Sequence, residues 1–234
     1  LKADLQKDTS RQLYGDGTGA VAVLTSGSST TVLNTATNES LLKGQIYPNM
    51  VINVGTLANP VSRSASPGTV SAVDPAGNGG LGTVTLVAAI SGSGAAGEFI
   101  FRYNNTAASS VSYETNGLQN IVSVSTGTSL GGLAASTEPL WDNVRLDNGG
   151  TTIVLDNLEK ILGRVRINGG KPTAAITSHG IRRQVFNALS SQIRYMEPQN
   201  LKGGFTAVQY GDYPIISDVD APYGRVYLLD EPQL

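Results

Sequence analysis

The sequence contains a single histidine, His179, which directly follows Ser178. Serine and histidine are two members of a hydrolytic triad, in which the imidazole accepts the hydroxyl proton. Adjacent residues at the start of a helix do not readily form that hydrogen bond while a third group orients the imidazole. We therefore expect Ser178 to begin a helix rather than to act as a nucleophile.

Carboxylates gather near the end of the chain, where they could bind calcium or act as a general acid and base. The residues concerned are Asp212, Asp218, Asp220, Asp230 and Glu231. Their spacing lacks the alternating aspartates and glycine of a calcium loop, and aspartate and glycine stand here where β-turns need them. We expect turns at these positions rather than a metal site.

The segment Gly15-Asp-Gly-Thr-Gly19 has the glycine content of a phosphate-binding loop, but it lacks the spacing and the Lys-Ser/Thr ending of such a loop and does not run from a strand to a helix. Gly15 is better explained as the end of an amphipathic helix that starts at the first residue. Leu1, Leu5 and Leu13 share one side of this helix, and its charged residues suit a solvated face.

The composition excludes several function classes. The chain has 234 residues, a formal net charge of −2 and 15% charged residues, against roughly 25% in ordinary domains. This charge disfavours a general nucleic-acid binder. Without cysteine there is no disulfide, cysteine zinc site, iron–sulfur cluster or thiol nucleophile. We expect no enzyme activity, no cofactor, no metal ion and no membrane segment.

Charge divides the chain into three parts: residues 1–43 hold eight charged side chains, residues 44–137 hold five, and residues 138–234 hold 21. The middle part contains short β-branched or aromatic runs separated by glycine-rich turns, which predict an antiparallel sheet or a small sandwich. The expected strands are 51–54, 69–73, 83–90, 98–103 and 121–124.

The last part predicts helices that pack on a sheet. Apolar residues at helical spacing indicate a helix over 153–166, a strand over 171–177 and a second helix after Ser178. The second helix has an apolar face of Ile181, Val185, Phe186, Leu189 and Ile193. Strands over 204–208, 213–217 and 225–230 complete an αβαβββ order, which is typical of an α+β subdomain.

Two groups of residues are candidates for a subunit interface. Arg182, Arg183 and Arg194 form a basic side of the second helix, which is either a solvated face or a contact with carboxylates of a neighbouring subunit. Trp141, in Glu138-Pro-Leu-Trp141, is either a core anchor or an interface residue.

Seven segments, in this order, resemble stretches of tailed-bacteriophage major capsid proteins. They include Asp4-Leu-Gln-Lys-Asp-Thr-Ser-Arg-Gln-Leu-Tyr-Gly-Asp-Gly-Thr-Gly19 and Ser178-His-Gly-Ile-Arg-Arg183. The others are 113–122, 138–141, 201–205, 213–218 and 224–229. Each segment by itself is weak evidence. The resemblance rests on the order and the separation of the segments, which are the same as in that family.

The resemblance implies an α+β fold of the Hong Kong 97 type, with a spine helix, a β-rich peripheral domain and an α/β axial domain. Residues 1–149 would hold the end of the spine helix and the peripheral domain with an insertion, and residues 150–234 the axial domain. The family's N-terminal arm, extended loop and final peripheral residues have no counterpart here, so we expect an incomplete subunit.

The implied function is structural. Copies of the chain would assemble as pentamers and hexamers into the icosahedral shell of a phage head, together with scaffold and portal proteins. The shell would form in the host cytoplasm and enclose double-stranded DNA without sequence-specific binding.

Two alternatives stay open. One is a glycan-binding or adhesive β-rich surface module, suggested by the Ser/Thr/Gly-rich middle part and the tyrosine content. The other is the shell protein of an encapsulating nanocompartment with the same fold, which would hold an enzyme instead of a genome.

Overall fold

The structure, a computed structural model, consists of two compact units, Leu1–Asn120 and Ile121–Leu234. It describes residues 2–63, 67–103, 114–123, 129–130, 133–134, 137, 143–152, 155–190, 208–210 and 213–230. Both helices and sheets occur, which confirms a mixed α+β protein. The boundary at 149/150 and the Hong Kong 97 type of fold stay predictions.

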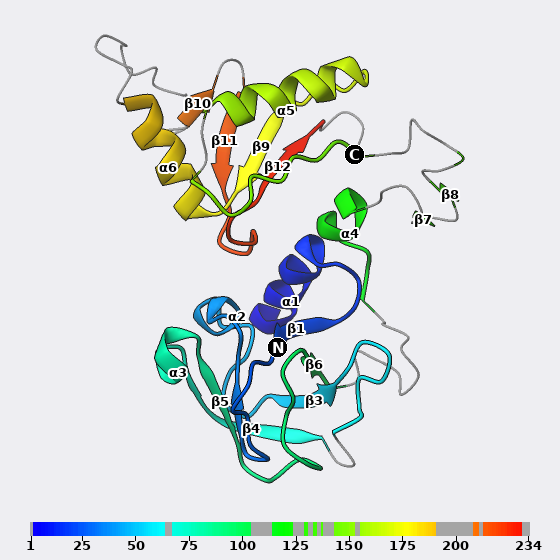
Figure 1. Cartoon of the computed structure of the whole chain (residues 1–234), viewed down its shortest axis with the longest axis vertical. Coiled ribbons are helices and arrows are strands. Elements are labelled where there is room, and N and C mark those ends of the chain that lie inside the picture. The colour runs from blue at the N-terminus through cyan, green and yellow to red at the C-terminus, as the bar shows by residue number, and fades with distance from the viewer. Residues whose placement is uncertain are drawn as a thin grey trace. The chain divides into compact units, whose positions relative to one another are not determined.

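The first unit combines a helix, α1 (Lys2–Tyr14), with an antiparallel sheet of six strands in the order β1-β6-β3-β4-β5-β2 (Figure 1). The strands are β1 (Ala20–Val23), β2 (Val32–Asn34), β3 (Val51–Gly55), β4 (Gly68–Asp74), β5 (Thr83–Leu86) and β6 (Phe99–Arg102). Two single-turn helices, α2 (Glu39–Leu42) and α3 (Gly77–Gly80), lie between strands.

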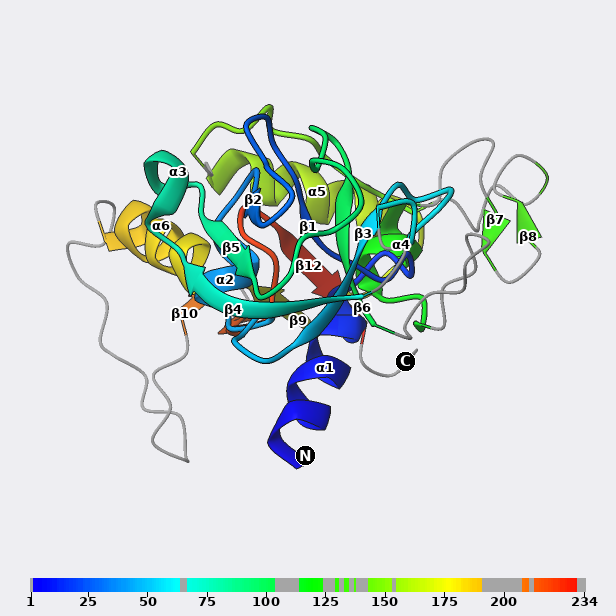
Figure 2. The same ribbon diagram turned by 90° about the horizontal axis from the view of Figure 1, so that it is seen from below.

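The sheet closes on itself. The outer strands β1 and β2 are joined through an isolated antiparallel bridge between Leu24 and Thr35. Around it, the Ala36 amide donates to the Val23 carbonyl and the Thr25 amide to the Asn34 carbonyl, each at 2.8 Å. The result is a small barrel, whose strands Figure 2 shows from below. Closure removes the exposed sheet edges that an open sheet would leave.

The barrel interior is filled by aliphatic side chains that alternate with polar residues along the strands. In β5, Val84 and Leu86 are buried whereas Thr83 and Thr85 are partly exposed, as the two-residue period of a strand requires. The interior comprises Val21, Ala22, Leu24, Leu33, Leu41, Ile46, Met50, Ile52, Val54, Val70, Val84, Leu86, Ile90 and Ile100. This burial explains why so few charged residues occur in the barrel sequence.

The chain enters and leaves the barrel at neighbouring points. β1, the first strand, pairs with β6, the last, with Ala20 opposite Phe101 and Val23 opposite Phe99. The barrel therefore has the topology of an insertion, and it starts well before the charge-poor stretch that begins at residue 44.

One predicted strand is wrong. Ile121 and Val122, expected within a strand over 121–124, belong instead to the short helix α4 (Leu118–Ser123). β-branched residues favour strands only where a neighbouring strand offers a pleated surface to pack on. No strand pairs with this segment among the described residues.

The second unit contains a four-stranded sheet in the order β10-β11-β9-β12, in which only β11 and β9 run parallel. Its elements are β7 (Ser129–Leu130), β8 (Leu133–Ala134), α5 (Leu155–Ile167), β9 (Ala174–Thr177), α6 (His179–Ser190), β10 (Val208–Tyr210), β11 (Tyr213–Ser217) and β12 (Val226–Leu229). From α5 onward they follow the predicted αβαβββ order.

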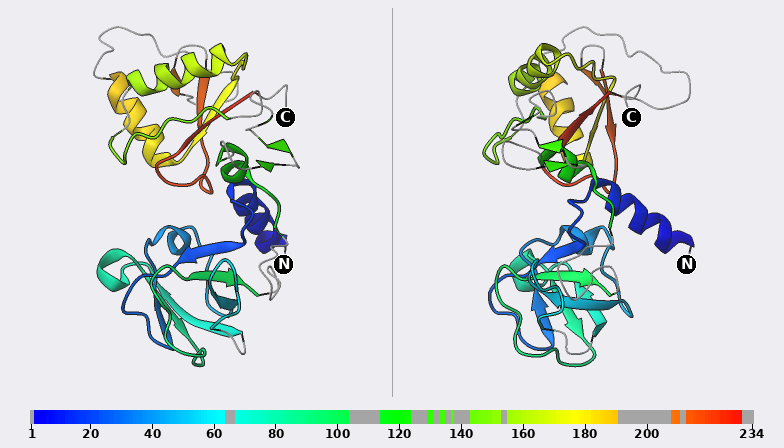
Figure 3. Two further views of the ribbon diagram at one scale, coloured as in Figure 1. Left: turned by 45° about the vertical axis from the view of Figure 1, so that its right-hand side comes forward. Right: turned by 90° about the vertical axis from the view of Figure 1, so that its right-hand side faces the viewer.

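Both helices of this unit cover one face of its sheet (Figure 3). Leu158 of α5 and Val185 of α6 pack with Ala175 of β9 and Ile215 of β11, which stand opposite each other in the ladder. The predicted arrangement of helices on a sheet is thus present. None of the described helices has the length and apolar character of a membrane span.

Candidate interaction sites and a buried charge cluster

The most elaborate polar contact of the first unit lies at α1. The Arg11 guanidinium binds two carboxylates: its Nη1 is 3.0 Å from an Oε of Glu114, and its Nη2 is 2.9 Å from Oδ1 of Asp8. A second hydrogen bond joins Arg11 and Glu114. Asp8 also accepts from Arg102 Nη1 at 3.0 Å and from Gln12 Nε2 at 3.0 Å. The cluster thereby ties α1 to the end of β6 and to Glu114.

These charges are buried. The side chains of Arg11 and Glu114 are only 9% and 3% exposed. Burial by itself lowers the pKa of Arg11, but the hydrogen bonds and charges of Glu114 and Asp8 outweigh it, and the pKa is raised. Arg11 therefore remains protonated at every physiological pH, and the bidentate pair gives the contact a defined geometry.

α1 buries the opposite face from the one its sequence suggests. Leu5 and Leu13 are 65% and 56% exposed, whereas Arg11 is 8% exposed. The expectation of a solvated charged face is wrong at Arg11, which is paired with Asp8 on this buried face. The physical reason is that Arg102 pairs with Asp8 and Glu114 pairs with Arg11. Because the opposite charges are paired, this face of the helix can be buried. Figure 3 shows α1 extending away from the barrel.

Gly117 lets the segment after Glu114 approach the end of α1. A Cβ at this position would lie 2.6 Å from the Leu13 carbonyl oxygen and 2.7 Å from the Gly15 nitrogen. Gly15 itself follows the last residue of α1, and its amide donates to the Gln12 carbonyl at 3.1 Å. This confirms the predicted helix end, and Asp16 forms a turn by accepting from the Thr18 amide at 3.0 Å.

We expect Gly117→Ala to destabilise the first unit by about 1–3 kcal/mol, because backbone atoms cannot move aside as a side chain can. Gly163→Ala is the control: nothing lies within 4 Å of a Cβ there, on α5. That variant should gain about 0.5–1 kcal/mol from helix propensity. Thermal unfolding of both variants checks the pair, and equal stability of Gly117→Ala and the parent chain would contradict the close approach.

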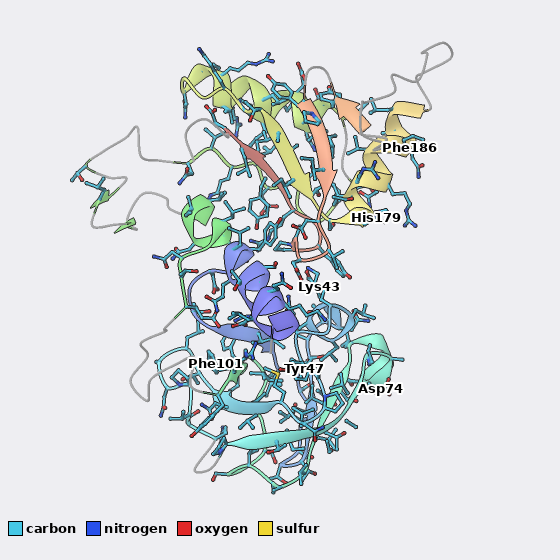
Figure 4. The ribbon with its side chains drawn as sticks, turned by 180° about the vertical axis from the view of Figure 1, so that it is seen from behind. Lys43, Tyr47, Asp74, Phe101, His179 and Phe186 are labelled. Atoms are coloured by element: carbon cyan, nitrogen blue, oxygen red, sulfur yellow. The ribbon has the colours of Figure 1, made fainter. Side chains whose placement is uncertain are left out.

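Two further ion pairs are partly buried in the first unit. Arg63 Nε lies 2.8 Å from Oε1 of Glu98, whose other oxygen accepts from the Ala95 amide at 2.8 Å. Lys43, which lies beside α1 in Figure 4, places its Nζ 2.7 Å from Oε1 of Glu39. The first pair joins the loop after β3 to the loop before β6, and the second lies within one helical turn, so both pairs serve the structure of the unit.

The arginines proposed for an interface are only partly described. Arg182 is half-buried near the start of α6, where its amide donates to the Ser178 carbonyl at 3.1 Å, and Arg183 is exposed one residue later. Arg194 and Trp141 lie outside the described residues. Arg183 is thus the described residue of this set that is best placed for contact with another molecule.

The apolar face predicted for α6 is correct in part. Val185 is buried, and Ile181 and Leu189 pack against the core of the second unit. Phe186, expected on the same face, is 55% exposed. Its place on α6 is labelled in Figure 4. Its position next to Val185 turns it by 100° around the helix, away from the sheet. Phe186 is therefore an exposed aromatic residue close to Arg183 in sequence.

The described residues with catalytic potential do not form a site. His179 is exposed at the first position of α6, and Ser178 is buried. Asp218 Oδ1 accepts from the Asp220 amide at 2.9 Å, which is the predicted turn role, and Asp230 accepts from the Lys171 amide at 3.3 Å. Asp212 and Glu231 lie outside the described residues. Within the described ranges, no three His, Asp or Glu residues are grouped as metal ligands.

A cation–aromatic contact lies among the described residues of the second unit. Arg166 Nη2 is 2.6 Å from the Tyr213 hydroxyl, and its guanidinium carbon is 5.7 Å from the centre of the ring. Nearby, burial raises the pKa of Tyr210, and the negative charge of Glu159 adds to the effect. These contacts join α5 to β10 and β11 and do not resemble a reaction site.

Taken together, the described contacts define a mixed α+β protein with an inserted barrel and no cluster of reactive side chains in the described ranges. Comparisons with family models, with curated proteins and with solved structures found no match.

Proposed function

We propose that the chain is a structural shell subunit, a major capsid protein of a tailed phage that assembles with copies of itself around double-stranded DNA. The observation that carries the proposal is the ordered resemblance of seven segments, from residue 4 to residue 229, to that family. The finer fold, with a spine helix, a peripheral domain and an axial domain of the Hong Kong 97 type, is part of the same proposal.

The topology of the first unit supports it. The barrel begins after α1 and returns beside its own first strand, so it adds to the helix without interrupting the contacts at Arg11. The resemblance implies a peripheral domain that carries an insertion, and a barrel with this topology agrees with that expectation.

Exposed apolar side chains on both units also support it. They include Leu5, Val87, Ile167, Phe186 and Val219, with values between 55% and 85%. Shell subunits need many modest contacts, since repetition around a closed shell multiplies small contact energies. Apolar residues surrounded by polar ones are typical of such contact surfaces.

The test is to examine the purified gene product by negative-stain electron microscopy under assembly conditions. Closed particles of uniform size would support the proposal. Dispersed monomers under all conditions would contradict it. Binding of the monomer to a glycan array would favour an adhesive module, and cargo-enzyme genes beside the coding gene, instead of terminase and portal genes, would favour a nanocompartment.

Within this proposal we expect Arg183→Glu to reduce the yield of particles by about tenfold or more, because the loss of ~1.4 kcal/mol in one contact changes its association constant tenfold. Arg183 is exposed, so unfolding of the monomer should change by no more than about 0.5 kcal/mol.

The matched control is Arg164→Glu, which reverses the charge of an exposed arginine on α5. Particle yield measured by sedimentation should fall for Arg183→Glu and not for Arg164→Glu. Equal yields of the two variants would remove Arg183 from the interface.

A further inference from the structure

Four asparagines in the chain are followed directly by glycine: Asn78, Asn116, Asn148 and Asn168. Asparagine is chemically labile at such positions, because the next backbone nitrogen can attack the side-chain amide and glycine offers no side chain to hinder it. The four pairs have the same local chemistry, so differences between them in the folded chain must come from their surroundings.

Three of the pairs are held by hydrogen bonds or by packing. Gly117 is packed against the backbone at the end of α1, and Asn116 Oδ1 accepts from Asn120 Nδ2 at 2.7 Å. The attacking nitrogens of the other two donate elsewhere: Gly149 to Asp147 Oδ1 at 2.8 Å, and Gly169 to the Arg166 carbonyl at 3.0 Å.

The Asn148 side chain has further partners. It donates to the carbonyls of Thr151 and Thr152, each at 3.2 Å, and its oxygen accepts from Asn157. Attack at this amide would require these contacts to break first.

Within the described ranges, the side chain of Asn78 and the amide of Gly79 lack such hydrogen bonds and packing. It is exposed in the turn between β4 and β5, which lies close to the labelled Asp74 in Figure 4. Among the described residues, neither its side chain nor the Gly79 amide has a hydrogen-bond partner. Nothing lies within 4 Å of a Cβ built on Gly79 or Gly80, so no neighbouring atom hinders attack at Asn78. The hydrogen bonds of this turn lie on either side of the reacting atoms, for example from Asn38 Nδ2 to the Gly80 carbonyl at 2.8 Å. Asn78 and Gly79 both have positive φ, 49° and 67°, which is uncommon for a residue with a side chain.

We propose that Asn78 is a site of spontaneous deamidation, with water as the co-reactant. The Gly79 nitrogen loses its proton and bonds to Cγ of Asn78, the Cγ–Nδ2 bond breaks, and ammonia leaves. Water then opens the cyclic imide at one of its two carbonyls, which yields aspartate or isoaspartate. The product adds one negative charge to the barrel surface, and the isoaspartate form also lengthens the backbone of the turn. This inference does not depend on the proposed function.

The test is peptide mapping of the intact chain after incubation in mildly alkaline buffer. Trypsin cleaves after Arg63 and Arg102, and Asn78 is the sole asparagine between them. The other three pairs fall on separate tryptic peptides. We expect the peptide 64–102 to gain about 1 Da, with a split elution peak for the isoaspartate form, before any other peptide changes.

The control is the same incubation in denaturant, where the four pairs should react at similar rates because their surroundings are lost. Asn78→Gln should abolish the change in peptide 64–102, since the longer side chain disfavours the imide. The proposal is overturned if, in the folded chain, another asparagine–glycine pair reacts as fast as Asn78, or if peptide 64–102 stays unchanged while the denatured chain reacts.

Discussion

Arg11→Ala is expected to lower the free energy of unfolding of the first unit by about 3–5 kcal/mol, because it takes the counter-charge of Arg11 away from the buried Glu114 carboxylate. Glu114, whose side chain is 3% exposed, loses both of its hydrogen bonds to Arg11. Asp8 keeps Arg102 and Gln12. Denaturant unfolding measures the loss, and hydrogen exchange should show it first at the amides of α1.

Two further variants separate the buried charge from the packing. Arg11→Met combined with Glu114→Leu should recover most of the lost stability, since an apolar pair of similar volume leaves no unpaired charge. Lys160→Ala removes an ion pair with Asp156 in which both side chains are more than half exposed, and it should cost less than about 0.5 kcal/mol. If Arg11→Ala cost no more than Lys160→Ala, the buried cluster would not anchor α1.

Leu33→Ala is the second substitution with a large expected effect, a loss of about 3–5 kcal/mol in the free energy of unfolding. Leu33 lies on β2, the strand through which the barrel closes, and it is fully buried among the interior side chains. Its removal leaves a cavity next to the single bridge between Leu24 and Thr35, so that loss of packing and loss of closure coincide.

Leu42→Ala provides the same chemical change on the surface, because Leu42 of α2 is 57% exposed. It should change stability by no more than about 0.5 kcal/mol. Thermal and denaturant unfolding of the two variants, followed by far-ultraviolet circular dichroism, compares them directly. A small effect of Leu33→Ala would mean that β2 does not belong to a closed core.

Most of the individual elements could be predicted from the sequence. The helix ending before Gly15 and the helix that starts after Ser178 are visible in patterns that span only a few residues. The same holds for β9, β11 and β12 and for β3 to β6, where short β-branched or aromatic runs lie between glycine-rich turns. Such patterns act through local geometry, so no knowledge of distant residues is needed.

The short strands β1 and β2 were missed for a physical reason. They contain four and three residues, with alanine and asparagine among them, and so lack the length and composition that predict strands. They exist because their neighbours, β6 and β5, supply hydrogen bonds from residues about 50 to 80 positions away. The closed barrel follows from those pairings, whereas residues 121–123 are helical and have no such partner strand in the described residues.

The candidate site, like the fold, has features that could be predicted from the sequence and others that could not. The sequence by itself determined the charged and apolar sides of α1, the basic side of α6 and the scarcity of reactive side chains. Only the tertiary structure decided which side of α1 is buried, because the carboxylate that pairs with Arg11 belongs to Glu114, 103 residues further along the chain. A charged face of a helix can be buried when residues distant in sequence supply charges of opposite sign. The periodicity of the helix carries no information about those distant residues.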